Sequence, residues 1–347
     1  MTTHANNHAK NAAVEAGNLV KTYPGDVRAL DGLSIEVRHG EVFGLLGPNG
    51  AGKSTAIKIL TTLARPDSGS ARVVGHDVLR QPDRVRRAIG VVAQRSGADP
   101  TATGRDNLIL QGRLYGLGGA RLRARVGELL ERFDLGGVAE RPVRTYSGGT
   151  QRRLDVALGL VHRPRVLFLD EPTTGLDPEA RTAMWDEIAR LAGTEGLTIL
   201  LTTHYLDEAD RLADRLAIVD RGRIAVTGTA DELKGALRGD AVHVELRQSP
   251  GGVERDVVRA VIAAVDGVRE VTMDGRRLSA RTDDGAVAVP AVLAALERSG
   301  VPVAAVTVAR PSLDDVYLRH VGRRYAEAEA DAEQARELVG TGQGGAR

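Results

Sequence analysis

The chain has 347 residues, enough for two or three structural units, and it lacks cysteine, which excludes disulfides and thiolate metal sites. Its 47 basic and 46 acidic residues leave a net charge of +1, and aromatic residues make up 3%, so we expect no nucleic-acid partner. No apolar run approaches the ~20 residues that cross a bilayer, and residues 1–10 lack the apolar core of a signal peptide, so we expect a cytoplasmic chain.

The first predicted elements are short strands. Residues 1–12 are polar and unpatterned, which predicts a disordered tail. From Val14 to Val42 the sequence indicates strands separated by turns at 24–26 and 38–40. Tyr23 lies just before the second strand, where it either packs at a strand end or offers an aromatic face to an adenine ring.

A glycine-rich loop follows an apolar strand at 41–46 and precedes a helix expected over 55–63. Its spacing is the phosphate-loop pattern, which arises by chance in a chain of this length on the order of one per cent of the time. Lys53 would reach the β- and γ-phosphates of a nucleotide, and the Ser54 hydroxyl would ligate Mg²⁺. The loop consists of Gly47, Pro48, Asn49, Gly50, Ala51, Gly52, Lys53, Ser54 and Thr55.

After this helix the sequence predicts a strand at 70–74, a helix at 84–88 and a strand at 89–93 that ends at Gln94. Residues 95–162 are mainly helical in pattern.

Within that helical region, Ser147, Gly148 and Gly149 precede an amphipathic segment at 154–161. Serine is a favoured N-cap residue, so we expect a helix start whose N–H groups and glycines face outward.

Two further buried strands end in polar residues. The run 165–171 ends in Asp170 and Glu171, and carboxylates seldom end a buried strand without a cation or a chemical role. Ligands bind at the carboxyl ends of parallel strands, so we assign Asp170 to Mg²⁺ and Glu171 to a general base acting on water. The strand 197–204 ends in His204, and this position favours a functional role over a structural one.

A second module follows a linker at 238–240. Its order of strands and helices, βαββαβ, predicts a small ferredoxin-like α+β domain over 241–323. It contains no catalytic cluster, so we expect a stabilising, regulatory or dimer-contacting role. A short helix at 313–318 and a flexible tail at 324–347 complete the chain. The expected elements are strand 241–247, helix 253–265, strands 267–273 and 277–282, helix 286–299 and strand 303–309.

Taken together, residues 13–237 resemble the ATP-binding cassette (ABC) family of ATPases. The motifs that carry the resemblance are the phosphate loop, Gln94, the Ser-Gly-Gly signature at 147–149, Asp170-Glu171, the loop with Asp177, and His204. The resemblance implies an α/β fold, a phosphate-loop core with antiparallel β and helical subdomains. It also implies ATP and Mg²⁺ as ligands and hydrolysis of ATP to ADP and phosphate.

The resemblance further implies roles for single residues. Tyr23 would stack on adenine, Gln94 would contact Mg²⁺ and the attacking water, and Gln94 would also link the site to a membrane partner. Glu171 would be the catalytic base and His204 would hold the γ-phosphate. Asp177 would organise the interface between two copies of the chain.

In this family the signature of one subunit closes over ATP bound to the other, so Ser147, Gly148 and Gly149 would contact nucleotide in a homodimer. Two departures bear on that closure. Tyr146 and Thr150 stand where the family usually has Leu and Gln, and Thr174-Gly175 replaces the more common Ser-Ala before Asp177.

The stretch Leu313–Leu318 resembles the drug-export branch of the family, the daunorubicin/doxorubicin-resistance type. That branch implies an ATPase at the cytoplasmic face of the membrane, which powers export of a hydrophobic compound, such as a drug or antibiotic, through a separate permease. Helical residues 95–160 would be the docking surface. The alternatives are a cytosolic ABC ATPase acting on ribosomes or nucleic acid, and a phosphotransferase.

Overall fold

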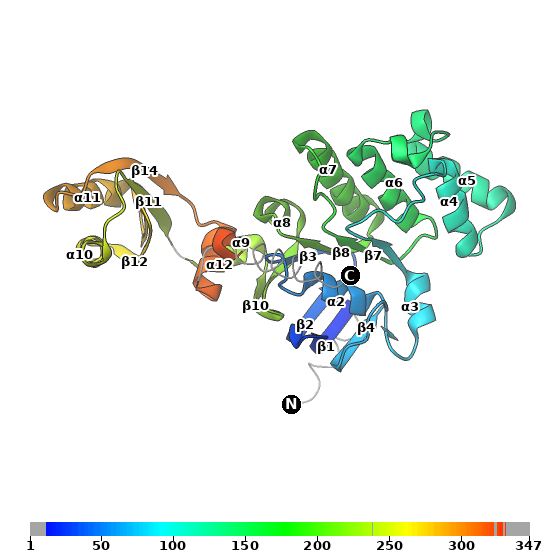
Figure 1. Ribbon diagram of the computed structural model, residues 1–347, viewed down its shortest axis with the longest axis horizontal. Helices are drawn as coiled ribbons and strands as arrows, with labels where there is room; N and C mark the ends of the chain where they lie inside the picture. Colours follow the sequence, from blue (N-terminus) through cyan, green and yellow to red (C-terminus); the bar gives the residue numbers. More distant parts are fainter. Residues whose placement is uncertain (1–11, 238, 323–324, 329, 331–347) are drawn as a thin grey trace, which may run out of the picture. The chain divides into compact units, whose positions relative to one another are not determined.

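The computed structural model describes residues 12–237, 239–322, 325–328 and 330 (Figure 1). The predicted flexible tail from residue 324 lies almost entirely outside these residues, as does the N-terminal tail up to residue 11. Ala12, which we placed in that tail, is instead the buried first residue of strand β1 and pairs with Arg38.

The chain divides into two units at a point slightly before the expected boundary of 237. Among the described residues, the first unit comprises 12–230 together with 325–328 and 330, and the second runs from Asp231 to Gly322. Helix α9 (Ala230–Gly235) begins at this division.

A six-stranded sheet forms the centre of the first unit, in the order β10-β9-β3-β8-β7-β6. All neighbours in it run parallel except β10, which pairs antiparallel with β9 at one edge. The residues that follow β3, β7 and β8 therefore meet at one edge of the sheet. The strands are β3 (Val42–Leu46), β6 (Ile89–Val92), β7 (Val166–Asp170), β8 (Thr198–Thr203), β9 (Arg215–Asp220) and β10 (Arg223–Gly228).

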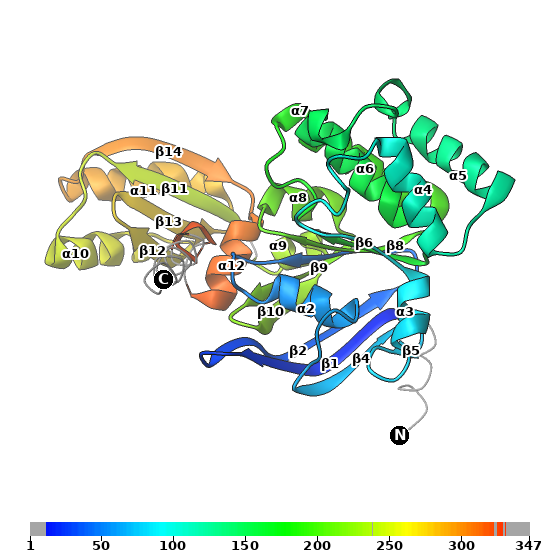
Figure 2. The same ribbon diagram turned by 45° about the vertical axis from the view of Figure 1, so that its right-hand side comes forward.

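A second sheet is antiparallel, in the order β2-β1-β4-β5, and helix α2 (Lys53–Leu60) lies between it and the central sheet (Figure 2). We expected this helix over 55–63. It begins earlier because Gly52 takes a left-handed conformation that starts the helix at Lys53, and Leu63 lies beyond it with 73% exposure. The strands are β1 (Ala12–Tyr23), β2 (Val27–Arg38), β4 (Ser68–Val73) and β5 (His76–Asp77).

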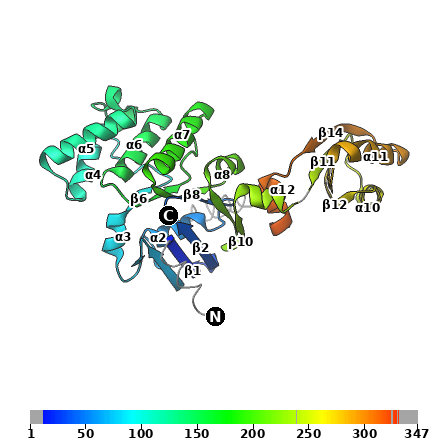
Figure 3. The ribbon, with the colours of Figure 1, turned by 180° about the vertical axis from the view of Figure 1, so that it is seen from behind.

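Helices cover the opposite face of the central sheet, and Figure 3 shows the same layers from behind. Helices α4, α5, α6 and α7 contribute side chains to the core on this face, and the shorter α3 and α8 follow β5 and β8 along the chain. The helices are α3 (Pro82–Ala88), α4 (Gly104–Leu114), α5 (Gly119–Arg132), α6 (Gly148–Leu160), α7 (Pro178–Glu195) and α8 (Leu206–Leu212), with 3₁₀ turns at Gly136–Val138 and Val143–Thr145.

Successive side chains of the inner strands enter two different cores. Phe168 and Leu200 pack with α2 and the antiparallel strands, whereas Leu169 and Leu201 pack with the helical layer. Neighbouring side chains of a strand point to opposite faces. Strands covered on both faces therefore need the uninterrupted apolar runs that the sequence contains.

The second unit has the predicted order of elements, βαββαβ, and its strands form an antiparallel sheet in the order β12-β13-β11-β14. Val244, Ile262 and Val292 belong to its core, which joins the sheet to both helices. The predicted helix at 313–318 extends to Val321. The elements are β11 (Asp240–Leu246), α10 (Gly252–Ala263), β12 (Val268–Asp274), β13 (Arg277–Thr282), α11 (Gly285–Arg298), β14 (Val303–Ala309) and α12 (Leu313–Val321).

Among the described residues, every helix is too short or too polar to cross a membrane.

Candidate functional site

The loop between β3 and α2 is closely packed against neighbouring backbone, and this packing requires glycine. A Cβ at Gly47 would lie 2.3 Å from the carbonyl oxygen of Val219, and one at Gly52 would lie 2.4 Å from that of Ala29. Gly52 also has φ of +107° and Gly50 has φ of +81°, conformations that L side chains rarely adopt. The predicted phosphate loop therefore has the conformation that lets backbone approach an anion closely.

Lys53, the first residue of α2, is only 4% exposed. Its ammonium donates hydrogen bonds to the carbonyls of Gly47 (2.6 Å) and Pro48 (3.1 Å) and lies 3.6 Å from Glu171 Oε1. A buried ammonium needs such partners because desolvation is costly. The lysine therefore bridges the glycine-rich loop and the end of strand β7.

Glu171 follows the last residue of β7 in a strained backbone conformation. Its φ is +50°, unusual for a residue with a side chain. Its N–H donates to both the carbonyl (3.1 Å) and the hydroxyl (3.0 Å) of Thr202 in the adjacent strand β8. Strain of this kind persists where surrounding contacts over-determine the backbone, and it concentrates at functional sites.

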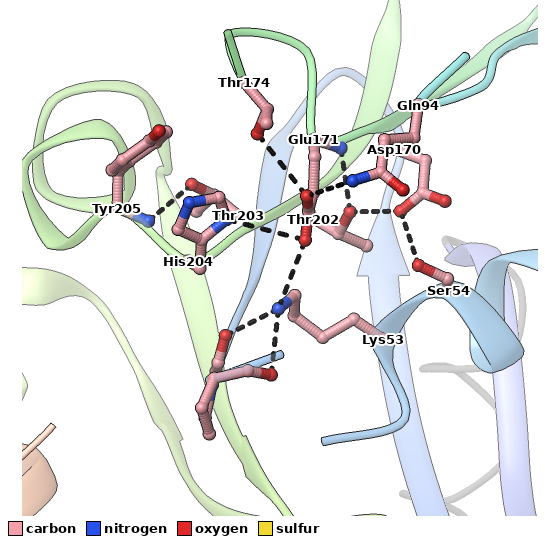
Figure 4. Close-up of polar contacts among 12 residues, drawn as sticks. Lys53, Ser54, Gln94, Asp170, Glu171, Thr174, Thr202, Thr203, His204 and Tyr205 are labelled. Atoms are coloured by element: carbon pink, nitrogen blue, oxygen red, sulfur yellow. Dashed lines mark hydrogen bonds and ion pairs between the residues drawn. The ribbon is translucent and has the colours of Figure 1, made fainter. Parts of the chain in front are cut away.

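The two carboxylate oxygens of Glu171 face different groups (Figure 4). Oε2 accepts from Gln94 Nε2 at 2.9 Å and from the Thr174 hydroxyl at 3.4 Å. Oε1 faces the Lys53 ammonium and His204 Nδ1, which lies 3.5 Å away. Burial raises the pKa of Glu171, but His204 and Lys53 outweigh it and lower that pKa to about 2.

Asp170 lies beside the first turn of α2. Its Oδ1 accepts hydrogen bonds from the Ser54 hydroxyl (3.1 Å) and the Thr202 hydroxyl (2.6 Å). A carboxylate and a hydroxyl at this spacing are hard oxygen donors of the kind that Mg²⁺ takes from proteins, alongside water and phosphate. The predicted pair of Ser54 and Asp170 is therefore brought together, and Gln94 is hydrogen-bonded to Glu171, the residue that follows Asp170.

Tyr23 and the remaining loop residues are placed by the β1–β2 hairpin and by α2. Tyr23 ends β1 opposite Val27, half-buried, with the Lys21 ammonium 5.6 Å from its ring centroid. Strand β2 of that hairpin passes Gly52 at Ala29. Asn49 in the loop and Thr55 in the first turn of α2 are likewise half-buried.

The signature forms the start of helix α6, as predicted. Ser147 is its N-cap, and its hydroxyl accepts from the N–H of Thr150 at 3.2 Å and lies 2.9 Å from the Thr150 hydroxyl. A Cβ at Gly149 would lie 2.9 Å from the Cβ of Ala180 in α7, so the glycine permits close packing of these two helix ends. Gly148 is the first residue of the helix.

Asp177 shares a surface with this signature. It caps α7 by accepting from the N–H of Ala180 at 2.8 Å. Ser147, Thr150, Arg153 and Asp177 line one cavity of about 350 Å³. The structure therefore brings some of the predicted site residues together in two sets. Lys53, Gln94 and His204 surround Glu171, and Ser147, Gly149 and Asp177 line this cavity.

One departure in the signature has a structural explanation. The hydroxyl of Tyr146 donates to the carbonyl of Val138 at 2.7 Å, and a Cβ at Gly104 would lie 2.4 Å from that hydroxyl oxygen. Tyr146 thus anchors the turn before α6 to the helical layer.

Two polar residues of the site, Thr202 and Arg152, were not predicted from the sequence. Thr202 binds both Asp170 and the backbone of Glu171. The sequence feature that could have predicted it is a hydroxyl residue near the end of an apolar strand. Arg152 of α6 is buried and binds the backbone around Glu171. The amphipathic pattern of α6 does not distinguish Arg152 from an arginine exposed to solvent.

Comparison with known families gives two matches. Residues 30–174 match the family described as ABC transporter. Residues 228–321 match a family described as the C-terminal domain of DrrA1-3-like ATP-binding proteins.

Curated proteins align with most of the chain. The daunorubicin resistance ATP-binding protein DrrA3 of Streptomyces coeruleorubidus is 48% identical over 318 residues, which cover 91% of this chain and 98% of the relative. The doxorubicin resistance ATP-binding protein DrrA of Mycobacterium tuberculosis is 44% identical over 315 residues, covering 88% and 92%. The Nod factor export ATP-binding protein I of Ralstonia nicotianae is 39% identical over 300 residues, covering 86% and 91%.

Solved structures share the fold of the first unit. One is a dimeric ATP-binding cassette in a post-hydrolysis state bound to ADP and Pi, with a TM-score of 0.58 at 25% identity, covering 62% of this chain and 98% of that one. Another is CbiO1 of Clostridium perfringens, described as part of an ABC transporter complex, with a TM-score of 0.60 at 25% identity, covering 74% and 96%.

Proposed function

The chain belongs to the ABC transporter family of ATPases, and from this premise we propose that it hydrolyses ATP as half of a homodimer that powers export through a separate membrane permease. The observation that carries the proposal is the position of the Glu171 carboxylate. It lies at the end of a buried strand, 3.6 Å from Lys53 and 2.9 Å from Gln94. This arrangement combines a phosphate-binding cation with a base.

The triphosphate of ATP would bind at the glycine-rich loop, with the start of α2 and the Lys53 ammonium facing its oxygens. Ser54 and Asp170 would hold Mg²⁺, to which the amide oxygen of Gln94 is a further candidate ligand. That ion would neutralise charge that develops on the phosphates. Tyr23, at the end of the hairpin that passes Gly52, would stack on adenine.

Glu171 would accept the proton of the attacking water. The water oxygen bonds to the γ-phosphorus while the bond to the bridging oxygen of ADP breaks, and His204 would hold the γ-phosphate. Phosphate oxygens attract the same two side chains, Lys53 and His204, that lower the pKa of Glu171. Binding of ATP would therefore draw these side chains from Glu171 and raise its pKa toward the range in which a carboxylate works as a base.

Subunits of this family act as dimers with a membrane permease. We place Ser147, Gly148 and Gly149 of one copy against ATP held by the other, where the start of α6 would supply N–H groups and positive dipole to the γ-phosphate. Asp177, on the same cavity as Ser147, would lie at that interface.

The cargo is proposed from the relatives. Their names concern daunorubicin resistance, doxorubicin resistance and Nod factor export, which favours export of a hydrophobic compound over the ribosomal, nucleic-acid and phosphotransferase alternatives. The permease would dock on helical residues 95–160, next to Gln94, and hold the chain at the cytoplasmic face of the membrane.

The test is Glu171→Gln. ATP binding should persist while hydrolysis falls by roughly 10²–10⁴-fold, because the base is removed and the phosphate site remains. A dimer with bound ATP should accumulate, measured by size-exclusion chromatography.

The matched control is Glu208→Gln. Glu208 is a second buried glutamate, and one of its oxygens accepts from both Thr173 and Trp185, a role that an amide oxygen retains. This variant should hydrolyse ATP normally. Normal turnover by Glu171→Gln would remove Glu171 from its proposed role.

A further inference from the structure

A buried arginine of the signature helix binds the backbone at two places in the site. Arg152 is 7% exposed, and its guanidinium donates four hydrogen bonds to main-chain carbonyls from two separate segments. One segment precedes Gln94 and the other surrounds Glu171. The acceptors are the carbonyls of Ala93 (2.6 Å), Asp170 (3.2 Å), Glu171 (3.1 Å) and Pro172 (2.7 Å).

These contacts surround the strained residue. Arg152 binds the carbonyl of Glu171 itself and those of its two chain neighbours, while Thr202 holds the Glu171 N–H. The backbone at φ +50° is therefore held from both sides. A planar guanidinium can reach carbonyls in several directions at once, which the single ammonium group of lysine does not reproduce.

One turn further along α6, Asp155 contacts the same segment as Arg152. Its Oδ1 accepts from the Ser96 hydroxyl at 2.6 Å, and its Oδ2 lies 3.9 Å from Arg152. Arg152 binds Ala93 and Asp155 binds Ser96, so one helix holds the chain on both sides of Gln94.

The same helix begins at the signature, with Ser147 as its N-cap. A helix moves largely as one body, because each turn is hydrogen-bonded to the next. We propose that Arg152 and Asp155 are positioning residues that tie the signature end of α6 to Gln94 and Glu171 of the same chain. Contact of Ser147 with the partner's nucleotide would thereby fix the base and the glutamine of the chain's own site.

This inference rests on the proposed function, since it assumes that Glu171 is the base. Its test compares Arg152→Met with Arg125→Met. Arg125 of α5 is also a buried arginine, and it donates to the carbonyls of Leu160 and Val161 at the other end of α6. Both substitutions remove a guanidinium from main-chain carbonyls, but only Arg152→Met removes contacts with the backbone next to Gln94 and Glu171.

In Arg152→Met, kcat should fall roughly 10²-fold, the loss typical of a catalytic group displaced by about 1 Å, while the KM for ATP stays unchanged. Arg125→Met should keep the wild-type kcat per folded molecule. Ser96→Ala, which removes one hydrogen bond from Asp155, should lower kcat by up to about tenfold. Arg152→Lys should resemble Arg152→Met, because lysine keeps the positive charge but lacks the planar guanidinium that binds several carbonyls at once.

Equal kcat losses in Arg152→Met and Arg125→Met would overturn the inference, as would a change in KM without one in kcat. If Arg152→Met does not fold, Ser96→Ala and Arg152→Lys decide the matter, and wild-type kcat in both overturns the inference. Collapse of hydrolysis in Glu171→Gln together with normal kcat in these variants rejects the positioning role alone. Normal hydrolysis in Glu171→Gln rejects the proposed function itself.

Discussion

Two regions of the first unit differ in how their polar groups are paired: the Lys53 end, which is the glycine-rich loop with Lys53 and Glu171, and the Ser147 end, which is the cavity lined by Ser147 and Asp177. At the first, Lys53 and Glu171 are both buried and contact each other and further polar groups of the same chain. At the second, Ser147 is exposed. Its hydroxyl and the Asp177 carboxylate cap their own helices and line a cavity of about 350 Å³.

This difference separates what one chain completes by itself from what it presents to another molecule. Buried charges need partners within the fold, so Lys53 and Glu171 hold each other in place without a second copy. A helix N-terminus on an exposed surface keeps its remaining N–H groups available to an anion. Substitutions at the Lys53 end should therefore alter ATP binding by a single chain. Substitutions at the Ser147 end should alter turnover only when two copies form a dimer.

The largest effect is expected for Lys53→Met. Loss of the ammonium removes the phosphate ligand and leaves Glu171 without the positive charge beside its carboxylate, so hydrolysis should fall at least ~10³-fold and ATP binding should weaken. The control is Lys58→Met in the exposed last turn of the same helix, which should hydrolyse ATP normally. Equal steady-state turnover by the two variants would contradict the assignment of Lys53.

A second prediction concerns pH. The folded-state pKa of Glu171, about 2, lies below the ordinary value of 4.5, so ionised Glu171 stabilises the fold above pH 4.5. That contribution, about 3 kcal/mol, should be lost as the pH falls from 4.5 toward 2. The free energy of unfolding, followed by fluorescence of the single tryptophan, Trp185, should therefore exceed that of Glu171→Gln at pH 7.

The gap between wild type and Glu171→Gln should narrow below pH 4.5, because protonation of the carboxyl removes the same interaction that the amide lacks. A gap between wild type and Glu171→Gln that stays constant with pH would show that the Lys53 and His204 contacts do not hold the ionised carboxylate.

Ser147→Ala tests the opposite end. Turnover should fall roughly 30-fold, because the start of α6 loses its cap and a ligand for the partner's phosphate, while a single chain binds ATP with unchanged affinity. Ser312→Ala removes the equivalent cap from α12 and should leave turnover unchanged. If titrated ATP binding to Ser147→Ala is weakened as strongly as turnover, the separation between the two ends fails.

The smallest effect is expected for Gln94→Ala, which removes the hydrogen bond to Glu171 Oε2. Turnover should fall about tenfold with unchanged ATP affinity, because the base loses one of the groups that orient it and stays anchored by its backbone. Gln111→Ala in α4 is the control. If Gln94→Ala and Gln111→Ala have the same steady-state rate, Gln94 does not orient the Glu171 carboxylate during hydrolysis.

Much of this organisation follows from the sequence. The strands of the central sheet are apolar runs, and parallel strands end at one edge, so Asp170, Glu171 and His204 were expected beside the phosphate loop. The order of elements in the second unit was also predicted, because turns and changes in hydrophobic period mark its boundaries. The start of α2 was misplaced by two residues, since the left-handed conformation of Gly52 begins the helix at Lys53.

The family, the phosphate loop and the polar ends of the strands could all be predicted from the sequence, because each depends on a short local motif. Only the tertiary structure decided which atom of Glu171 faces Lys53 and His204 and which faces Gln94, and that Arg152 holds the backbone around the base. Those contacts join segments far apart in the chain, and they depend on how α6 packs against the ends of the strands. An amphipathic pattern specifies which face of a helix is buried, and the packed fold specifies what a long side chain on that face reaches.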